Sequence, residues 1–376
     1  MIDKIRKIDR EKMFLVSIVL ISSMYILSYT YTQAIQPIKY LFILMRSVSY
    51  FLVAIKFTLD FLENRYSIKD IVPITIFGLF FVIVSYQTKT IGYLVYYIFI
   101  VVGRDVNYEK IIKTACLSFM FSTALIVFLS KVNVIEDYIF IQGERHRHGL
   151  GFVGATYLPC LYMFIVLYHG YLKKKDVSVL ELVSFFVINL LIFILTRTKS
   201  AFALTNIFLL MLVLLKYVKP LRKYYSPYKY VSILLPIVVS TGICFLSYLY
   251  DDKIEWMSRL NNLLTGRLRL AKLGFDTNGI SVFARHIVER FDEGYNYIDS
   301  CYVRILVIFG IAFYVVFIAY LIYYALLINK KKDIYMLAIF VILVVRATFD
   351  AELLSMGFNY FLFLLSYREL KVLNYE

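Results

Sequence analysis

The sequence predicts an all-α, polytopic integral membrane protein of about twelve transmembrane helices. Hydrophobic residues make up 61% of the 376 residues and the mean hydropathy is +0.73, which is more apolar surface than a soluble domain can bury. Apolar runs of about 15 to 25 residues recur along the chain, which favours helices over the alternating segments of a β-barrel. The net charge of +15 could indicate nucleic acid, but in a membrane protein it is typical of positive loops on the cytoplasmic side, so we expect no nucleic-acid partner.

The first element follows a basic start, "MIDKIRKIDREK", and its apolar run is long enough to remain in the membrane. We therefore expect no cleaved signal peptide. Read in the same way along the chain, the predicted spans are residues 13–30, 38–58, 70–86, 90–103, 112–130, 150–170, 179–196, 200–216, 230–250, 301–327, 334–349 and 352–367.

Basic residues alternate between the two sides of these spans. One side holds the basic residues before the first span and after every second span, including Lys173 to Lys175 and Lys330 to Lys332. This alternation predicts an even number of spans, with both termini in the cytoplasm. The whole chain, 1–376, is then a single multi-pass membrane domain.

A few basic residues fall on the opposite, external side and break the alternation. They lie in four places: the basic loop 131–149 with Arg145 and Arg147, the turn "TRTKS" with Arg197 and Lys199, the long loop 251–300 between spans 9 and 10, and Arg346. Because positive charge on this side opposes the usual bias, we interpret these residues as ligand contacts. The alternative is pairing with lipid phosphate or within the protein.

The loop 251–300 is the only long external segment. Within it, residues 258–276 have the spacing of an amphipathic helix at the outer membrane interface. Arg267 lies inside the apolar arc of that helix and needs a partner, which is either a protein carboxylate or the phosphate of a lipid-linked substrate.

Further along, several titratable residues surround His286, which could act as a general base. Arg346 and Asp350 are four residues apart and can pair. The four cysteines form no metal-spaced set and are expected to be free thiols, and no metal site or soluble cofactor is expected.

Ordered short motifs in the C-terminal two-thirds resemble the bacterial O-antigen and capsular polysaccharide polymerases of the Wzy type, within the O-antigen ligase-like superfamily. "RHGLGF" at 147–152 is similar to an Arg-x-Ser-Leu-Gly-Phe stretch, and "TRTKSAF" at 196–202 to a Thr-x-Ser-Arg-Thr-x-Phe turn. The stretch 260–284 resembles a Leu-Ser-Gly-Arg segment followed by Gly-Ile-x-Leu-Phe-Gly, and 298–311 resembles a Val-Asp-Asn-x-Tyr helix entry. The chain departs from the family at 153–155, Lys199 and Ala284.

The resemblance implies a polymerase that moves a glycan from its polyprenyl diphosphate to a hydroxyl of an incoming lipid-linked repeat unit, outside the cytoplasm. Its partners would be those lipid-linked units, with a chain-length regulator and a flippase of the same pathway. The expected diphosphate-binding residues are Arg147 and Arg267, supported by Arg145, Arg197, Lys199 and Arg346. The expected general base is His286 or Asp299, whereas His148 would orient a neighbour.

Two alternatives remain open from the sequence. A related ligase would pass the glycan to a different acceptor with the same arginines. A flippase for lipid-linked oligosaccharides would place charges along a path through two similar halves, and the sequence contains no visible repeat.

Overall fold

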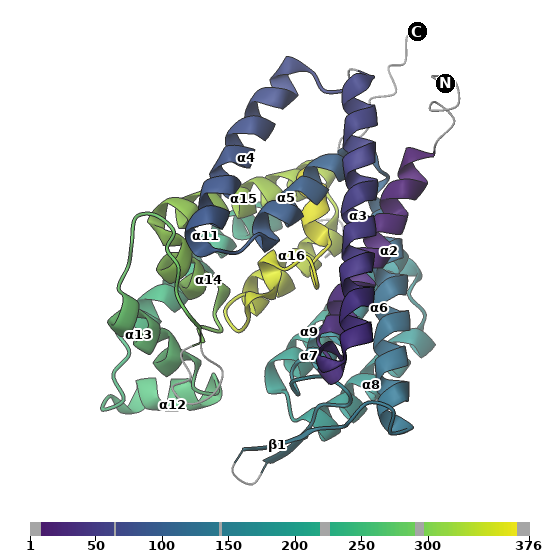
Figure 1. Cartoon of the computed structure of the whole chain (residues 1–376). Helices are drawn as coiled ribbons and strands as arrows, with labels where there is room; N and C mark the ends of the chain where they lie inside the picture. The colour runs from purple at the N-terminus through teal and green to yellow at the C-terminus, as the bar shows by residue number, and fades with distance from the viewer. Residues whose placement is uncertain (1–8, 64, 143–144, 219–225, 290–296, 367–376) are drawn as a thin grey trace. The chain divides into compact units, whose positions relative to one another are not determined.

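The computed structural model describes residues 9–63, 65–142, 145–218, 226–289 and 297–366 (Figure 1). The chain divides into two compact units: unit 1 comprises residues 1–76, 97–210 and 356–376, and unit 2 comprises residues 77–96 and 211–355. The helices and strands are α2 (Arg10–Ser28), α3 (Gln36–Leu62), α4 (Ile68–Thr88), α5 (Gly92–Val102), α6 (Tyr108–Lys131), β1 (Ile139–Gln142), β2 (Arg145–His148), α7 (Tyr157–Lys173), α8 (Val179–Thr196), α9 (Lys199–Tyr217), α11 (Ser226–Tyr248), α12 (Glu255–Leu263), α13 (Arg267–Asn278), α14 (Cys301–Arg304), α15 (Gly310–Lys331) and α16 (Ile334–Arg346).

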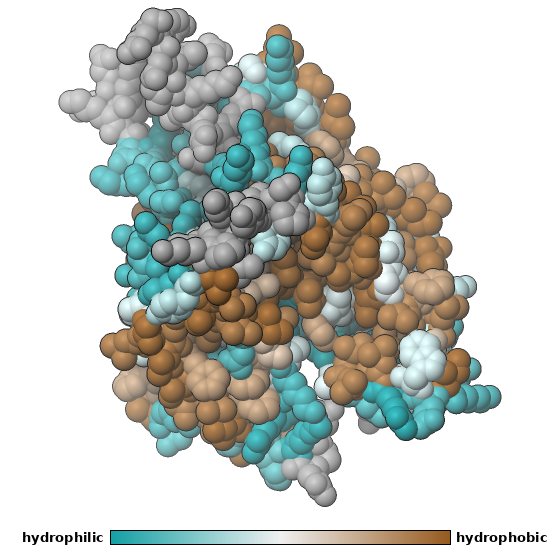
Figure 2. Space-filling model, turned by 180° about the vertical axis from the view of Figure 1, so that it is seen from behind, coloured by the Kyte–Doolittle hydropathy of each residue, from teal (hydrophilic) through white to brown (hydrophobic). Residues whose placement is uncertain are grey.

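The fold is helical, as predicted, and within the described residues eight helical stretches are long and apolar enough to cross a membrane. They are α2, α3, α4, α6, α8, α9, α11 and the stretch Cys301–Lys331. Large apolar side chains on these helices are exposed, and Figure 2 shows hydrophobic residues covering much of one face. Such surface is stable only against lipid, so the chain is a membrane protein.

Three further predicted spans form shorter helices. α5 has 11 residues, α16 has 13, and α7 has 17 because it begins at Tyr157 rather than near residue 150. The delay has a local cause: Leu150 and Gly151 have positive φ angles of 51° and 89°, so residues 149–152 form a turn. A Cβ on Gly151 would also lie 2.9 Å from a side-chain carbon of Ile126 on α6.

The predicted twelfth span, 352–367, is not a continuous helix where the structure describes it. The part of unit 1 from Met356 to Ser366 is buried and irregular, with a 3-10 turn at Phe361–Leu365. The Tyr168 hydroxyl donates to the carbonyl of Phe358 and accepts from the backbone N–H of Tyr360 at 2.9 Å. Irregular backbone of this kind is tolerated in a membrane protein when other groups satisfy its polar atoms.

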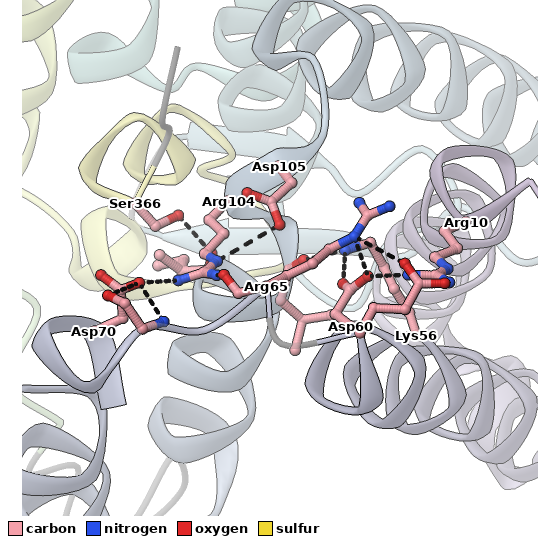
Figure 3. Close-up of polar contacts among 12 residues, drawn as sticks. Arg10, Lys56, Asp60, Arg65, Asp70, Arg104, Asp105 and Ser366 are labelled. Atoms are coloured by element: carbon pink, nitrogen blue, oxygen red, sulfur yellow. Dashed lines mark hydrogen bonds and ion pairs between the residues drawn. The ribbon is translucent and has the colours of Figure 1, made fainter. Parts of the chain in front are cut away.

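A network of ion pairs gathers several segment ends of unit 1 at one place (Figure 3). Asp60, near the end of α3, accepts from Lys56 at 2.6 Å and from Arg10, the first residue of α2, at 3.0 Å. Arg104, after α5, lies 3.4 Å from Asp70 in the first turn of α4. These ends lie together, as the alternation of basic residues requires for segments on one side of the membrane.

The opposite end of α2 contacts the loop between α6 and α7, and together they form a second group. Tyr29, after α2, accepts from the N–H of Val153 at 2.8 Å, and Thr30 bridges to Phe152. The basic loop between α6 and α7 contains an antiparallel hairpin, β1 paired with β2, in which Phe140 faces Arg147. α2 has 19 residues, about 28 Å of helix, which separates the two groups by roughly the thickness of a bilayer core.

Unit 2 is built around α11, α15 and α16. At one end, the Asn329 amide donates to the Ser232 hydroxyl at 3.0 Å, which joins the end of α15 to the start of α11. At the other end, Lys272 of α13 donates to the carbonyl of Tyr248, where α11 ends, at 3.0 Å. The Tyr302 hydroxyl donates to the carbonyl of Val344 at 2.9 Å, which fixes α14 against α16 near the same end.

The predicted amphipathic helix over 258–276 is two helices instead. α12 and α13 are separated at Thr265 and Gly266, whose φ angles are 55° and 86°. Two successive left-handed residues end the first helix and turn the chain, for which glycine is suited. Leu260, Leu264 and Leu268 still face inward, packing with Tyr250 and Met257 below α11.

Cys301–Lys331 is interrupted at Gly310, which has φ 82° and ψ 173°. Residues 279–289, named here the crossing segment, run in non-helical conformation beside the interruption. The N–H groups of Ile311 and Ala312 donate to the carbonyls of Ser281 and Val282 at 2.9 and 3.0 Å, and the N–H of Arg285 donates to Ile308 at 2.9 Å. The crossing segment thereby satisfies backbone groups that the broken helix leaves open.

Replacing Gly310 with alanine is expected to destabilise the protein by about 3 kcal/mol. The left-handed, extended backbone is strained for any residue with a Cβ, and that Cβ would lie 2.7 Å from the carbonyl oxygen of Val282. The measurement is the midpoint of thermal unfolding in detergent. Gly242→Ala in α11 is the matched control, because a Cβ there meets nothing within 4 Å, and its midpoint should not fall. Equal midpoints for the two variants would contradict the assigned interruption.

Candidate functional site

A cluster of five charged residues lies at the α13 end of unit 2, and we name it the charged cluster. It comprises Arg267 at the start of α13, Asp299 just before α14, Arg346 at the end of α16, and Asp350 and Glu352 beyond it. Two positive groups thus meet three carboxyl groups. The cluster forms because the backbone N–H of Cys301 donates to the carbonyl of Ala347 at 2.9 Å, which draws residues 299–301 to the end of α16.

Arg346 is the buried centre of the cluster, with a side chain only 2% exposed. Its guanidinium donates to both carboxylate oxygens of Glu352, at 2.9 and 3.0 Å, and contacts Asp350. Carboxylate oxygens of Asp350 and Glu352 lie within 4.8 Å of each other, which is close enough for both to bind one cation. The guanidinium of Arg346 is that cation. A buried, two-pronged pair of this kind holds the loop after α16 in place, and breaking it would be costly.

Arg267 is held more loosely than Arg346. Its Nε donates to the carbonyl of Phe349 at 2.8 Å, and its guanidinium contacts the Thr265 hydroxyl. The nearest carboxylate oxygens, from Asp299 and Asp350, are each 3.9 Å away, and the side chain is 14% exposed. The guanidinium is therefore oriented by backbone and hydroxyl groups while its charge is only partly neutralised, an arrangement that can accept an anionic ligand.

The two aspartates have perturbed pKa values. Burial raises the pKa of Asp299, and the charge of Arg267 opposes that rise. Burial also raises the pKa of Asp350 to about 7, against the attraction of Arg346. Because the charged form is disfavoured in the folded protein, Asp350 contributes stability at acidic pH that is lost as the pH rises toward 7. Carboxyl groups with raised pKa values are suited to taking a proton near neutral pH.

Arg304 forms a second strong pair beside the cluster. Its guanidinium binds both carboxylate oxygens of Glu289, one of them at 2.5 Å, and lies 4.7 Å from the centre of the Tyr297 ring. Since Asp299 stands between Tyr297 and Arg304 in the chain, this pair ties the end of the crossing segment to the stretch that carries Asp299.

His286, the other predicted base, lies in the crossing segment and is exposed. Its Nδ1 is 3.2 Å from the carbonyl oxygen of Thr88, and no contact with the charged cluster is found among the described residues. Of the two predicted bases, only Asp299 lies in the cluster with Arg267.

The remaining predicted site residues belong to unit 1. Arg147 on β2 is half-buried and donates to the carbonyl of Thr196 at 3.1 Å and to the Thr198 hydroxyl at 3.2 Å. The basic loop and the "TRTKS" turn, which are 49 residues apart at this contact, are therefore adjacent. Arg145, Arg197 and Lys199 are exposed around this contact.

His148 and Asp137 order the base of the hairpin. The imidazole Nδ1 lies 2.8 Å from one carboxylate oxygen of Asp137, and the other oxygen accepts from the N–H of Leu150 at 2.7 Å. His148 and Asp137 therefore lie next to the turn that precedes α7.

The sequence did not single out Glu352 or Arg304, and Glu289 was one of the titratable residues noted around His286. Glu352 follows Arg346 by six residues across a helix end, so no helical spacing predicts the pair. The Arg346–Asp350 contact, in contrast, follows the four-residue spacing and is confirmed. All four cysteines are buried free thiols, as expected.

Comparisons with known proteins leave the family open. No protein-family model matches the chain, and neither curated proteins nor solved structures include a significant match.

Proposed function

We propose that the chain is a membrane glycosyltransferase of the Wzy type, a polysaccharide polymerase that uses a polyprenyl-diphosphate-linked donor. The observation that carries the proposal is Arg267: an oriented, incompletely neutralised guanidinium beside a carboxyl group of raised pKa. Transfer of a sugar from a diphosphate needs these two functions together, stabilisation of the leaving diphosphate and removal of a proton from the acceptor.

In the proposed reaction, the diphosphate of the donor binds Arg267 and displaces the weak contacts to the two aspartates. A hydroxyl oxygen of the incoming lipid-linked unit attacks the anomeric carbon, and the bond from that carbon to the diphosphate oxygen breaks. Asp299 takes the hydroxyl proton, and Arg267 stabilises the charge on the departing diphosphate. Arg346 positions Asp350 and, through its two bonds to Glu352, the chain that follows α16. The diphosphate bond supplies the energy, so the scheme requires no soluble cofactor.

The proposal includes a topology. We place both termini in the cytoplasm of a bacterium, with twelve crossings of its cytoplasmic membrane and residues 251–300 outside. The grouping of Arg10, Lys56, Arg65 and Arg104 at one end of unit 1 supports this alternation. The Arg147 contact with the "TRTKS" turn, at the other end of unit 1, would form a second external basic region.

The test is incubation of the purified chain, in lipid vesicles, with one lipid-linked repeat unit as the sole substrate. A polymerase yields a ladder of products that differ by one repeat. Transfer only after a second acceptor is added would favour a ligase instead. Movement of the unit across the bilayer without any product of higher mass would favour a flippase and reject the proposed reaction.

A further inference from the structure

Arg46 is a charged residue within the long apolar helix α3, and the proposed function does not use it. About 15 Å of helix separates Arg46 from Gln36, where α3 begins, and the residue is exposed. Among the described residues, Arg46 forms no hydrogen bond and no ion pair. An unpaired charge at this depth of a membrane helix is costly, so Arg46 needs an anionic partner.

Arg46 lies at the edge of the inward face of α3. The Ser49 hydroxyl on this face donates to the carbonyl of Ser17 at 2.9 Å, so the face packs against α2. Further along it, Lys56 and Asp60 form an ion pair at 2.6 Å (Figure 3). At about 100° per residue, Arg46 falls beside Val53 in the arc of buried residues, which are Phe42, Ser49, Val53, Lys56 and Asp60. The buried charges of this face are therefore paired at its Asp60 end, whereas the charge of Arg46 is left for a ligand.

Two phenol hydroxyls lie near the Arg46 guanidinium. They belong to Tyr25 on α2 and Tyr50 on α3, and the charge of Arg46 acts on both. The Tyr50 ring is held against that of Phe99, with the ring centroids 6.2 Å apart. In the part of the chain that the structure describes, neither hydroxyl has a hydrogen-bond partner. A guanidinium and two hydroxyls are thus present with no acceptor, and together they can donate to an oxyanion.

We propose that Arg46, Tyr25 and Tyr50 bind the phosphodiester group of a membrane phospholipid. A phosphodiester carries one negative charge, which balances the single positive charge of Arg46, and its oxygens can also accept from both hydroxyls. The depth is suitable, because α3 is about 40 Å long and exceeds a bilayer core by about 10 Å. Since a long basic side chain leans toward the start of its helix, the guanidinium reaches the level of lipid phosphates.

Exposed apolar residues of α3 continue from this site. Leu44, Val48 and Phe51 are 59%, 38% and 65% exposed and lie close to Arg46 on the same helix. The acyl chains of the bound phospholipid would cover them. A diphosphate carries more than one negative charge and would leave charge uncompensated at Arg46, so a phospholipid fits this site better than a diphosphate lipid does. The inference is independent of the proposed function.

The first experiment measures bound lipid by native mass spectrometry. The full-length chain in detergent is titrated with dioleoyl phosphatidylglycerol or with dioleoylglycerol, which has the same acyl chains and no phosphate. We expect phosphatidylglycerol to be retained and dioleoylglycerol to be lost. Arg46→Met should weaken the binding of phosphatidylglycerol about tenfold, whereas Lys39→Met, which removes an exposed charge from the same helix, should leave it unchanged. Equal retention by Arg46→Met, or equal retention of dioleoylglycerol, would overturn the inference and indicate contact with bulk lipid only.

The second experiment tests the hydroxyls and the source of the anion. Replacing Tyr25 and Tyr50 together with phenylalanine keeps both rings and the charge of Arg46, and should weaken phosphatidylglycerol binding several-fold. Unchanged binding in this double variant would overturn the assigned site. Displacement of phosphatidylglycerol by an equal concentration of farnesyl diphosphate would assign the site to a diphosphate lipid instead. A lipid-free dimer that Arg46→Met abolishes would assign the counter-charge to a second copy of the chain and would also overturn the inference.

Discussion

Replacing Arg267 with alanine is expected to lower the rate of glycan transfer by about 10²- to 10³-fold. The effect follows from the position of its guanidinium, which the carbonyl of Phe349 and the Thr265 hydroxyl orient and which the two aspartates neutralise only at 3.9 Å. Without the Arg267 guanidinium, no positive charge lies between the leaving diphosphate and the carboxyl groups of Asp299 and Asp350. The measurement is the initial rate at which the second repeat is added to a lipid-linked unit.

Two variants control for loss of structure. Arg269 is two residues further along α13 and exposed, so Arg269→Ala should retain the wild-type rate. Arg267→Lys keeps the positive charge but lacks the planar guanidinium, so its rate should lie between those of Arg267→Ala and Arg269→Ala. All three are compared after their unfolding midpoints have been measured. If Arg267→Ala folds and elongates chains at the wild-type rate, the anion site is wrongly placed.

The same variant distinguishes the enzyme from a transporter. If the chain is a transferase, Arg267→Ala still allows lipid-linked units to reach the outer face, and long chains are missing. If the variant stops export itself, the flippase alternative gains support and the assignment of Arg267 to sugar transfer fails.

The sequence predicted the class and most of the long helices, because both depend on local composition. Eight of the twelve predicted spans correspond to apolar stretches of membrane length among the described residues. The other four predicted spans depend on tertiary contacts that composition does not encode. The stretch after Met356 stays irregular because the hydroxyl of Tyr168, which is 190 residues from Phe358 in the chain, satisfies its backbone. Likewise, the interruption at Gly310 exists only because the crossing segment passes beside it.

The part of the candidate site that depends on local residue spacing was predictable, and the part that depends on the path of the chain was not. Arg267 was identified because a charge within an apolar arc needs a partner, and the structure supplies Asp299 and Asp350 at 3.9 Å. Leu260, Leu264 and Leu268 pack on one side, as an apolar arc requires, but the helix breaks at Gly266 and Leu263, on the same predicted arc, is 77% exposed. Glu352 was beyond prediction, since its pairing with Arg346 depends on the path of the chain after α16 ends.

The largest stability effect is expected in unit 1, from Asp60→Asn. The Asp60 carboxylate is fully buried and forms ion pairs with Lys56 at 2.6 Å and with Arg10 at 3.0 Å (Figure 3). Asparagine keeps the size and one acceptor but leaves the ammonium of Lys56, which is only 3% exposed, without a counter-charge. Removing one partner from a buried ion pair costs about 3–5 kcal/mol, and we expect a loss of that size in the free energy of unfolding in mixed micelles.

The reason for this cost can be tested with a matched control and a double replacement. Glu63→Gln removes a carboxylate that also pairs with Arg10 but is 35% exposed, so its loss should be below about 1 kcal/mol. Replacing Lys56 with methionine and Asp60 with leucine together removes both buried charges, and this double variant should recover most of the stability that Asp60→Asn loses. If the double variant is no more stable than Asp60→Asn, then the carboxylate acts through Arg10 and the ends of α2 and α3, and the uncompensated charge of Lys56 is not the cause.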